Sequence, residues 1–148
     1  MTECIIMRGL PGSGKSHKAR RLQQTGREVA EQYVILSADD WFIDTATSEY
    51  LFDFTQLKPA HRAVRKAARR CLEAGVSIIV DNTHSRRAEW GAVRNIASGL
   101  GVPVREVMPS NWWSWDVREC YLRGAHGCPE EKIQQMKERW ETWNVLTD

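Results

Sequence analysis

The sequence predicts an α/β protein in which a mostly parallel sheet of about four strands carries helices on both of its faces. Three observations support this fold class: short apolar runs alternate with longer segments of helical period, the first three runs end in polar or glycine-rich clusters, and no repeat or linker interrupts the order. Runs that are apolar throughout are typical of parallel strands buried on both faces. Ligands bind such sheets at the carboxyl ends of the strands, so the clusters mark the expected functional edge.

The individual elements follow in chain order. Strands are expected at residues 4–8, 33–36, 76–80 and 102–107. Helices, recognised by apolar side chains at helical spacing, are expected at residues 15–24, 59–74 and 86–98. The first of these helices is expected to end near Gly26, a fourth to run from the N-cap residue Ser114 to about Arg123, and the last to begin at Pro129. At 148 residues, the whole chain is expected to be one domain with a lid near residues 114–130.

The amino-acid composition argues against several classes of protein. The formal net charge of +2 is too small to mark the whole surface as a nucleic-acid binder, so any attraction to phosphates depends on local clusters. The four cysteines have no CxxC spacing, which argues against a zinc site and a disulfide framework and favours reduced thiols. No segment resembles a secretory signal or a membrane span. We therefore expect a protein of the cytoplasm or nucleus without a membrane partner.

Residues 9–16 carry the clearest motif, because Gly-Leu-Pro-Gly-Ser-Gly-Lys-Ser matches G-x-x-x-x-G-K-[ST] in full. The motif lies between an expected strand and an expected helix, where backbone amides at a helix N-terminus cradle phosphates. Lys15 is expected to reach the outer phosphates and the Ser16 hydroxyl to ligate Mg²⁺. The sequence thus predicts a three-layer P-loop NTPase fold that binds ATP or another purine triphosphate. The expected binding residues are Gly9, Leu10, Pro11, Gly12, Ser13, Gly14, Lys15 and Ser16.

Acidic residues follow the second and third expected strands. A kinase for an alcohol needs a carboxylate that takes the proton of the acceptor oxygen, and Asp39 is the candidate for this general base. Alternatively, Asp39 or Asp40 caps the segment that follows, and both roles can coexist. Asp81 follows its strand as a Walker B acid would and is a second magnesium candidate, or it forms a strand-end turn with Asn82.

Arginine and tryptophan residues supply candidates for the lid and the acceptor surface. Arg123 ends the expected lid helix and either covers the transferred phosphate or interacts with the helix dipole. Trp41 is placed to stack on an acceptor base. Residues 112–115 contain three tryptophans, expected to pack beneath the lid or to form a wall facing adenine. Core positions are expected for Trp90, Trp140 and Trp143.

A basic stripe is expected on the helix at residues 59–74. It either follows a phosphodiester backbone or is a solvated outer face. Its residues are Arg62, Arg65, Lys66, Arg69 and Arg70.

Four motifs occur in an informative order: residues 9–16, Leu-Ser-Ala-Asp-Asp-Trp-Phe at 36–42, Ile-Val-Asp-Asn-Thr-His at 79–84 and Tyr-Leu-Arg-Gly-Ala-His-Gly at 121–127. In these motifs the chain resembles the polynucleotide 5′-hydroxyl kinase family of P-loop phosphotransferases, in particular its small single-domain kinase-like members. The resemblance implies a purine triphosphate donor, magnesium as cofactor, Asp39 as base for a 5′-hydroxyl and Arg123 as the lid arginine. The candidate substrate-binding residues are Asp40, Trp41, Asn82 and Thr83.

Two positions depart from the pattern of that family. Phe42 stands where its members place an arginine that holds the phosphate of the acceptor, and Gly127 stands where they place a second lid arginine, with His126 beside it as a pH-dependent substitute. The leading hypothesis is a magnesium-dependent kinase of a single-stranded DNA or RNA 5′ end. The alternatives are a kinase of a nucleoside, a sugar or a hydroxymethylated base, which Phe42 favours, and a nucleotide-binding interaction module with little catalysis.

Overall fold

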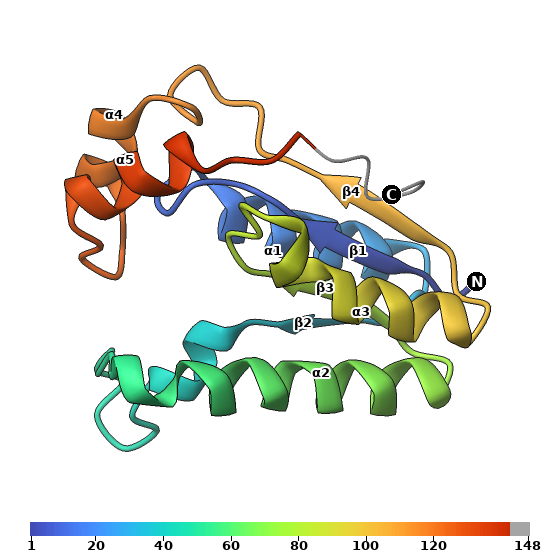
Figure 1. Cartoon of the computed structure of the whole chain (residues 1–148). Helices are drawn as coiled ribbons and strands as arrows, with labels where there is room; N and C mark the ends of the chain where they lie inside the picture. The colour runs from blue at the N-terminus through green and yellow to red at the C-terminus, as the bar shows by residue number, and fades with distance from the viewer. Residues whose placement is uncertain (143–148) are drawn as a thin grey trace.

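A four-stranded sheet organises the computed structural model, which describes residues 1–142 (Figure 1). Every neighbouring pair of strands is parallel, and the spatial order is β2-β3-β1-β4. The predicted fold class is therefore confirmed. The strands are β1 (Cys4–Met7), β2 (Tyr33–Leu36), β3 (Ser77–Asp81) and β4 (Val104–Val107). β4 begins two residues later than predicted because Pro103 has no N–H for the ladder, although its carbonyl accepts the Cys4 N–H at 2.9 Å.

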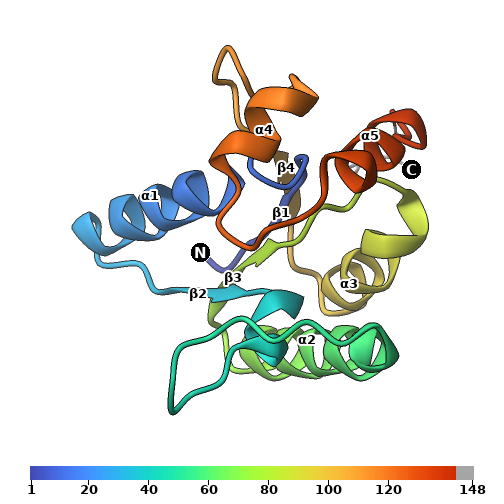
Figure 2. The same cartoon turned by 90° about the vertical axis from the view of Figure 1, so that its left-hand side faces the viewer.

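Helices cover both faces of this sheet. Figure 2 views the carboxyl edge and shows α1 on one side of the sheet and α2 and α3 on the other. No helix among residues 1–142 is long and apolar enough to cross a membrane. The helices are α1 (Lys15–Glu28), α2 (Leu57–Glu73), α3 (Arg87–Gly99), α4 (Val117–Arg123) and α5 (Glu130–Glu138), with short 3-10 turns η1 (Ala38–Phe42) and η2 (Phe54–Gln56).

The core consists of two layers because side chains alternate along the buried strands. Cys4 and Ile6 of β1 pack with α2 and α3, and the fully buried Trp90 of α3 belongs to the same layer, as predicted. Ile5 and Met7 face α1 instead. Since β1 is buried on both sides, its end carries the phosphate-binding loop on a rigid support.

α1 continues two residues past Gly26, where the sequence predicts its end. Gly26 is a buried position of the helix because the ring of Tyr33 lies against it, and a Cβ at this residue would overlap that ring. The glycine therefore serves close packing between α1 and β2 rather than termination of the helix. The chain leaves α1 through Val29 and through Ala30, which has a φ of 60°.

α4 and α5 form a helical lid over the carboxyl edge of the sheet (Figures 1 and 2). The prediction that Ser114 caps α4 is wrong, because Asp116 is the N-cap residue and its carboxylate accepts the Glu119 N–H at 3.0 Å. α5 ends before Trp140, which packs partly buried beyond the helix. Trp143, predicted in the core, lies outside the described residues.

One buried arginine, which the sequence pattern does not identify, contacts several segments at the carboxyl edge of the sheet. Arg8 follows β1, is 1% exposed and donates to the carbonyls of His84 at 2.7 Å and Ser85 at 3.3 Å. Its guanidinium also lies 4.7 Å from the ring centroid of Trp140, a cation–π distance. Arg8 therefore joins the segment after β3 to the chain that leaves α5.

Candidate active site

The glycine-rich loop joins β1 to α1 and places its last residues at the N-terminus of α1 (Figure 2). Gly12 and Gly14 adopt φ angles of 79° and 94°, which residues with a Cβ rarely adopt. Gly12 also approaches α4 so closely that an added Cβ would overlap the carbonyl oxygen of Cys120. Amides of a loop in such a conformation, at a helix N-terminus, suit a phosphate group.

The chain before α4 fixes this loop from the lid side. Ser114 is buried and donates its hydroxyl to the carbonyl oxygen of Ser13 at 2.8 Å, and the Asn111 side chain reaches the same oxygen at 3.4 Å. On the opposite side, the Gly9 N–H donates to the carbonyl oxygen of Thr83 at 3.2 Å. The phosphate-binding loop is therefore held between the lid and the segment that follows β3.

Lys15 and Asp81 form a buried pair beneath the loop. The lysine Nζ lies 3.4 Å from Asp81 Oδ1, and their side chains are only 10% and 6% exposed. The parallel register explains this pairing, since Met7 of β1 stands opposite Asp81 of β3. The charges compensate each other where water has little access, and removing either residue would leave the other charge buried and unpaired.

The same corner fits a magnesium ion. Within the described part of the chain, Asp81 Oδ1 and the buried Ser13 hydroxyl have no hydrogen-bond partner, although Lys15 Nζ pairs with this Asp81 oxygen. Ser16 follows Lys15 in the first turn of α1. No group of three or more His, Cys, Asp or Glu side chains among residues 1–142 forms a metal site. Magnesium suits such a corner because it binds through one or two protein ligands together with water and substrate phosphates.

Asp39 lies in η1, directly after β2. The cap of this turn is Ser37, whose hydroxyl accepts the Asp39 N–H at 3.2 Å, so neither Asp39 nor Asp40 fills that position. Asn82 adds a second support, because its side-chain oxygen accepts the Ala38 N–H at 2.9 Å. The backbone of η1 is thus fixed to the strand ends while the carboxylate of Asp39 remains available for other contacts.

Two side chains distant in sequence reach the Asp39 carboxylate. The Tyr50 hydroxyl donates to Oδ1 at 2.9 Å, and His126 Nε2 from the lid lies 3.9 Å from Oδ2. The Tyr50 and His126 rings also pack together at a centroid distance of 4.3 Å. Burial and the nearby carboxylate raise the pKa of Tyr50 above its ordinary value, so the phenol stays protonated and donates. Burial and the charge of Asp39 raise the pKa of Asp40 above its ordinary value.

Replacing Tyr50 with phenylalanine tests whether this hydrogen bond matters to the chemistry. A hydrogen bond to a charged group contributes about 1.5–3 kcal/mol. If Asp39 is the base of a phosphoryl transfer from ATP, kcat should fall about tenfold while KM for ATP changes little. Steady-state kinetics checks this result, with Tyr121→Phe as the control because the exposed Tyr121 ring lies on α4 against Arg118, away from Asp39. An unchanged kcat for Tyr50→Phe would show that Asp39 needs no help from the phenol.

The sequence does not reveal Tyr50 as a site residue. An isolated antiparallel bridge between Ile43 and Tyr50 brings it back to η1, and Asp44 closes the intervening turn by accepting the Ala46 N–H at 2.8 Å. The only local signal is the run of turn-forming residues at 44–48, which lies between two segments that contain aromatic residues. His84 and Arg8 are likewise missing from the predicted site.

Arg123 lies at the end of α4, in the lid. Its Nε is 3.3 Å from Glu119 Oε2, and its guanidinium lies 4.1 Å from the ring centroid of Trp113. Trp113 packs beneath the lid against Leu10 and Ile133, one of the two places the sequence allows for it. Arg123 therefore stacks on the Trp113 ring, and this contact limits the orientations of its guanidinium group.

The other predicted acceptor residues have diverse surroundings. Trp41 is 48% exposed and adjoins the Asp39–Asp40 pair, whereas Phe42 is 5% exposed and packs against Phe52 at 5.0 Å. The position where an arginine would hold the acceptor therefore points into the core. Along the basic stripe, Arg62, Lys66, Arg69 and Arg70 are exposed and Arg65 is half-buried, and of these five residues Arg62 and Arg65 line a cavity beside α3.

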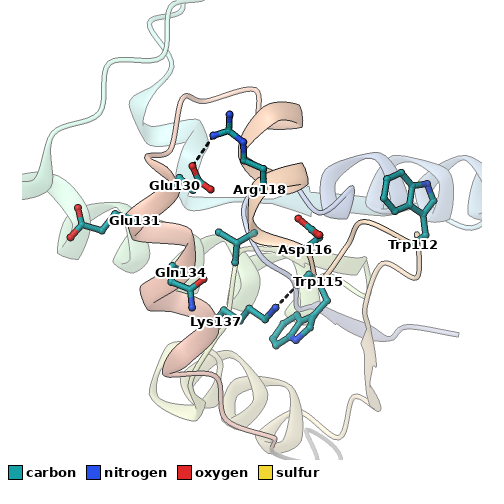
Figure 3. Close-up of a pocket in the computed structure, with 9 residues that line it drawn as sticks. Trp112, Trp115, Asp116, Arg118, Glu130, Glu131, Gln134 and Lys137 are labelled. Carbon is teal, nitrogen blue, oxygen red and sulfur yellow. Dashed lines mark hydrogen bonds and ion pairs between the residues drawn. The ribbon is translucent and has the colours of Figure 1, made fainter.

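A hollow of about 690 Å³ lies between the start of α4 and α5 (Figure 3). None of the predicted catalytic residues lines it. Its two basic side chains already have partners: Arg118 pairs with Glu130 at 2.9 Å, and Lys137 Nζ donates to the Trp115 carbonyl oxygen at 2.7 Å. This hollow is therefore separate from the candidate active site.

Comparison with solved structures identifies the fold. The Pnkp1/Rnl/Hen1 RNA repair complex contains a chain that aligns with a TM-score of 0.71 and 19% identity, over 93% of this chain and 43% of that one. Chaetomium thermophilum Kti12 with ADP-AlF3 aligns with a TM-score of 0.67 and 19% identity, over 97% and 83%. The Mycobacterium tuberculosis APS kinase CysC with AMPPNP and APS aligns with a TM-score of 0.63 and 18% identity, over 85% and 70%. The fold is thus a P-loop kinase-like fold.

The chain is similar in sequence to parts of much longer proteins. It is 35% identical over 138 residues to human NEDD4-binding protein 2, covering 93% of this chain and 8% of that protein. It is 27% identical over 161 residues to human YLP motif-containing protein 1, covering 93% and 7%. The chain therefore spans less than a tenth of the length of either relative. Residues 4–142 match the family model of an AAA domain, and the chain belongs to this family.

Proposed function

We propose that this chain is a magnesium-dependent kinase that transfers the terminal phosphoryl group of a purine triphosphate, by preference ATP, to the 5′-hydroxyl of a polynucleotide. One observation carries the proposal: the Asp39 carboxylate is held at the carboxyl edge of the sheet by Tyr50 and approached by His126 from the lid. A nucleotide switch or binding module needs the phosphate loop and its lysine. It has no need of a carboxylate held just beyond the end of β2.

The donor side uses the loop between β1 and α1. The loop amides and Lys15 bind the phosphates, and Ser16 and Asp81 are the residues that would hold magnesium. When bound, the ion neutralises charge on the phosphates during transfer. The nucleotides named for the APS kinase and Kti12 structures, AMPPNP and ADP-AlF3, support a nucleotide at this position.

The acceptor side uses Asp39. Its carboxylate removes the proton of the acceptor hydroxyl as that oxygen attacks the γ-phosphorus, and the bond from phosphorus to the β,γ-bridging oxygen breaks to release ADP. The exposed ring of Trp41 offers a surface on which a terminal base can stack. A polynucleotide acceptor is further supported by the similarity to a chain of an RNA repair complex.

Arg123 is the proposed lid cation that stabilises charge on the transferred phosphoryl group. We expect Arg123→Gln to lower kcat by about tenfold to a hundredfold, the effect of losing one hydrogen bond to a charged group. The Kd for ATP, measured by calorimetry, should change by less than about threefold. The contacts that bind ATP equally well in the ground state and the transition state come from the loop. Arg118→Gln is the matched control, since Arg118 lies on the same helix and pairs with Glu130. If the two variants have equal kcat values, Arg123 interacts only with the C-terminal end of α4 and takes no part in phosphoryl transfer.

A kinase of a smaller alcohol is the second candidate. Phe42 favours it because the buried ring replaces the arginine that would hold the phosphate of a polynucleotide at that position. The similarity to an APS kinase whose structure contains bound APS agrees with a small acceptor.

Labelled ATP distinguishes these functions. The protein is incubated with γ-labelled ATP and magnesium, together with 5′-hydroxyl DNA or RNA oligonucleotides, nucleosides, simple sugars or water alone. Label on oligonucleotides supports the proposal, and label only on nucleosides or sugars supports the smaller acceptor. A protein that binds ATP in calorimetry but labels no acceptor is an interaction module, and the proposal is then wrong.

A further inference from the structure

His126 lies in the segment that joins α4 to α5, between two glycines. Gly124 is the C-cap residue of α4, and Gly127 adopts a φ of 67°. Figure 2 shows this segment crossing the carboxyl edge of the sheet. The lid therefore carries an imidazole ring to the side of the sheet where Asp39 lies.

Tyr50 fixes this histidine and the proposed base relative to each other. Its hydroxyl donates to Asp39 Oδ1 at 2.9 Å, and its ring packs on the His126 ring with the centroids 4.3 Å apart and the planes tilted by 36°. His126 Nε2 then lies 3.9 Å from the other carboxylate oxygen, Asp39 Oδ2. Because the two contacts of Tyr50 share one side chain, the histidine and the carboxylate form a single arrangement.

The gap between His126 Nε2 and Asp39 Oδ2 has the width of a bridged contact. At 3.9 Å it is longer than a direct hydrogen bond. An oxygen atom about 2.8 Å from each atom would span it, as a bridging water does at many polar sites. The two side chains are 42% and 44% exposed, so a ligand can reach the space between them.

The two oxygens of Asp39 are not equivalent. Among residues 1–142, Oδ1 accepts the Tyr50 hydroxyl, whereas Oδ2 has only the long contact to His126. An acceptor hydroxyl that donates its hydrogen to Oδ2 would therefore place its oxygen beside His126 Nε2. An alcohol oxygen has two lone pairs, so it can accept one hydrogen bond and still use the other pair as a nucleophile.

We propose that His126 is a second acceptor-binding residue, whose Nε2–H donates a hydrogen bond to the acceptor hydroxyl while Asp39 Oδ2 receives the proton of that hydroxyl. The inference rests on the proposed function and adds a residue to its acceptor side. During transfer the O–H bond breaks and its proton moves to Oδ2, the oxygen forms a bond to the γ-phosphorus, and the bond from phosphorus to the β,γ-bridging oxygen breaks to release ADP. His126 keeps its own proton and directs the attacking lone pair.

This role differs from that of a second lid arginine. A substitute for that arginine would act on a phosphate and would need the positive charge of a protonated ring. A donor to a neutral hydroxyl needs no charge, because a neutral imidazole with its hydrogen on Nε2 supplies the N–H. In the structure His126 contacts the base, Asp39, which agrees with a place beside the acceptor oxygen.

Binding of acceptors with and without the hydroxyl tests the contact without requiring catalysis. Protein saturated with ADP and magnesium is titrated calorimetrically with single-stranded oligonucleotides and with adenosine, each with a 5′-hydroxyl or as the 5′-deoxy form. We expect the hydroxyl forms to bind about tenfold to a hundredfold more tightly, since the hydroxyl makes one hydrogen bond to a carboxylate and one to His126.

Two variants assign part of this preference to His126. His126→Phe keeps an aromatic ring against Tyr50 but has no donor, and should reduce the preference for the hydroxyl by about threefold to tenfold. His126→Gln retains an N–H donor in its amide and should keep most of the preference. In steady-state transfer, kcat/KM for the acceptor should fall about tenfold in His126→Phe and less than about threefold in His126→Gln, while KM for ATP stays within about twofold in both.

The pH profile distinguishes the two roles of His126. The ionisable groups around it are Asp39 and Asp40 of η1 and Tyr50 of the loop that follows. A cation on the transferred phosphate would lose its charge as pH rises through the range in which histidine titrates. We expect the activity of wild type relative to His126→Gln not to decline between about pH 6 and about pH 9. A decline would place His126 on the phosphate and overturn the inference.

The outcomes separate this inference from the proposed function. A preference for the hydroxyl that is the same in wild type and His126→Phe overturns the inference, and so does the absence of any preference or of any acceptor binding. A preference that His126→Phe weakens, in protein that transfers no label, supports the contact and contradicts the kinase proposal. Transfer of label that is undiminished in His126→Phe does the reverse.

Discussion

Replacing Asp39 with asparagine should lower kcat for phosphoryl transfer by about 10²-fold to 10⁴-fold, the range typical of a lost general base. Asparagine keeps the size of the side chain and can still accept the Tyr50 hydrogen bond, but its amide cannot take a proton from the acceptor hydroxyl. The affinity for ATP should change by less than about threefold, because Asp39 lies outside the phosphate loop. Rapid-quench measurement of a single turnover isolates the chemical step.

Glu49→Gln provides the control for this variant. It makes the same change from carboxylate to amide in the exposed part of the loop that leads to Tyr50, and we expect kcat to stay within about twofold, as for most surface substitutions. If Asp39→Asn keeps full activity, another group takes the proton and the assignment of Asp39 is wrong. Loss of activity in Lys15→Ala would be uninformative by comparison, since every nucleotide-binding function needs that lysine.

The second large effect is expected for Gly12→Ala. The added methyl group would overlap the Cys120 carbonyl oxygen, which is backbone and cannot rotate away, and alanine is strained at a φ of 79°. Strain and overpacking together should reduce the free energy of unfolding by about 2 to 6 kcal/mol. The thermal midpoint should fall by about 5 to 20 °C, and the stabilisation that ATP and magnesium confer on wild type should largely disappear.

Gly91→Ala is the matched control for the glycine prediction. Gly91 lies inside α3, and no atom lies within 4 Å of a Cβ added there. Alanine is the better helix former by about 1 kcal/mol, so Tm should stay the same or rise. Differential scanning fluorimetry with and without ATP and magnesium measures both variants. A Gly12→Ala protein that melts like wild type would disprove the close approach of the loop to α4.

Local sequence patterns were enough to predict the strands of the sheet and the position of the phosphate loop. Largely apolar runs identify β1 and β3, and the glycine spacing with Lys15 identifies the loop because both signals lie within a few neighbouring residues. The ends of elements were less predictable, since they depend on contacts between distant segments. Gly26 does not end α1 because the ring of Tyr33 covers it, a contact that the local pattern does not contain.

Long-range contacts explain what the sequence could not reveal about the site. Ser114 looks like a helix cap in its local context, yet it bonds to Ser13, 101 residues away. Tyr50 reaches Asp39 across 11 residues of irregular chain, where no periodicity marks an inward-facing side chain. The cavity between α2 and α3 depends on two helices and a strand end meeting, so the basic stripe alone could not show that Arg62 and Arg65 line a cavity while Arg69 and Arg70 do not.

The lid contacts both halves of the site. At its base Ser114 and Cys120 adjoin the phosphate loop, and beyond α4 His126 adjoins Asp39. We expect a ligand that orders one of these ends to change the affinity of the other end for its own ligand. Such linkage is reciprocal: the factor by which nucleotide changes the affinity for the acceptor must equal the factor by which acceptor changes the affinity for nucleotide. The lid thus connects two binding equilibria that would otherwise be independent.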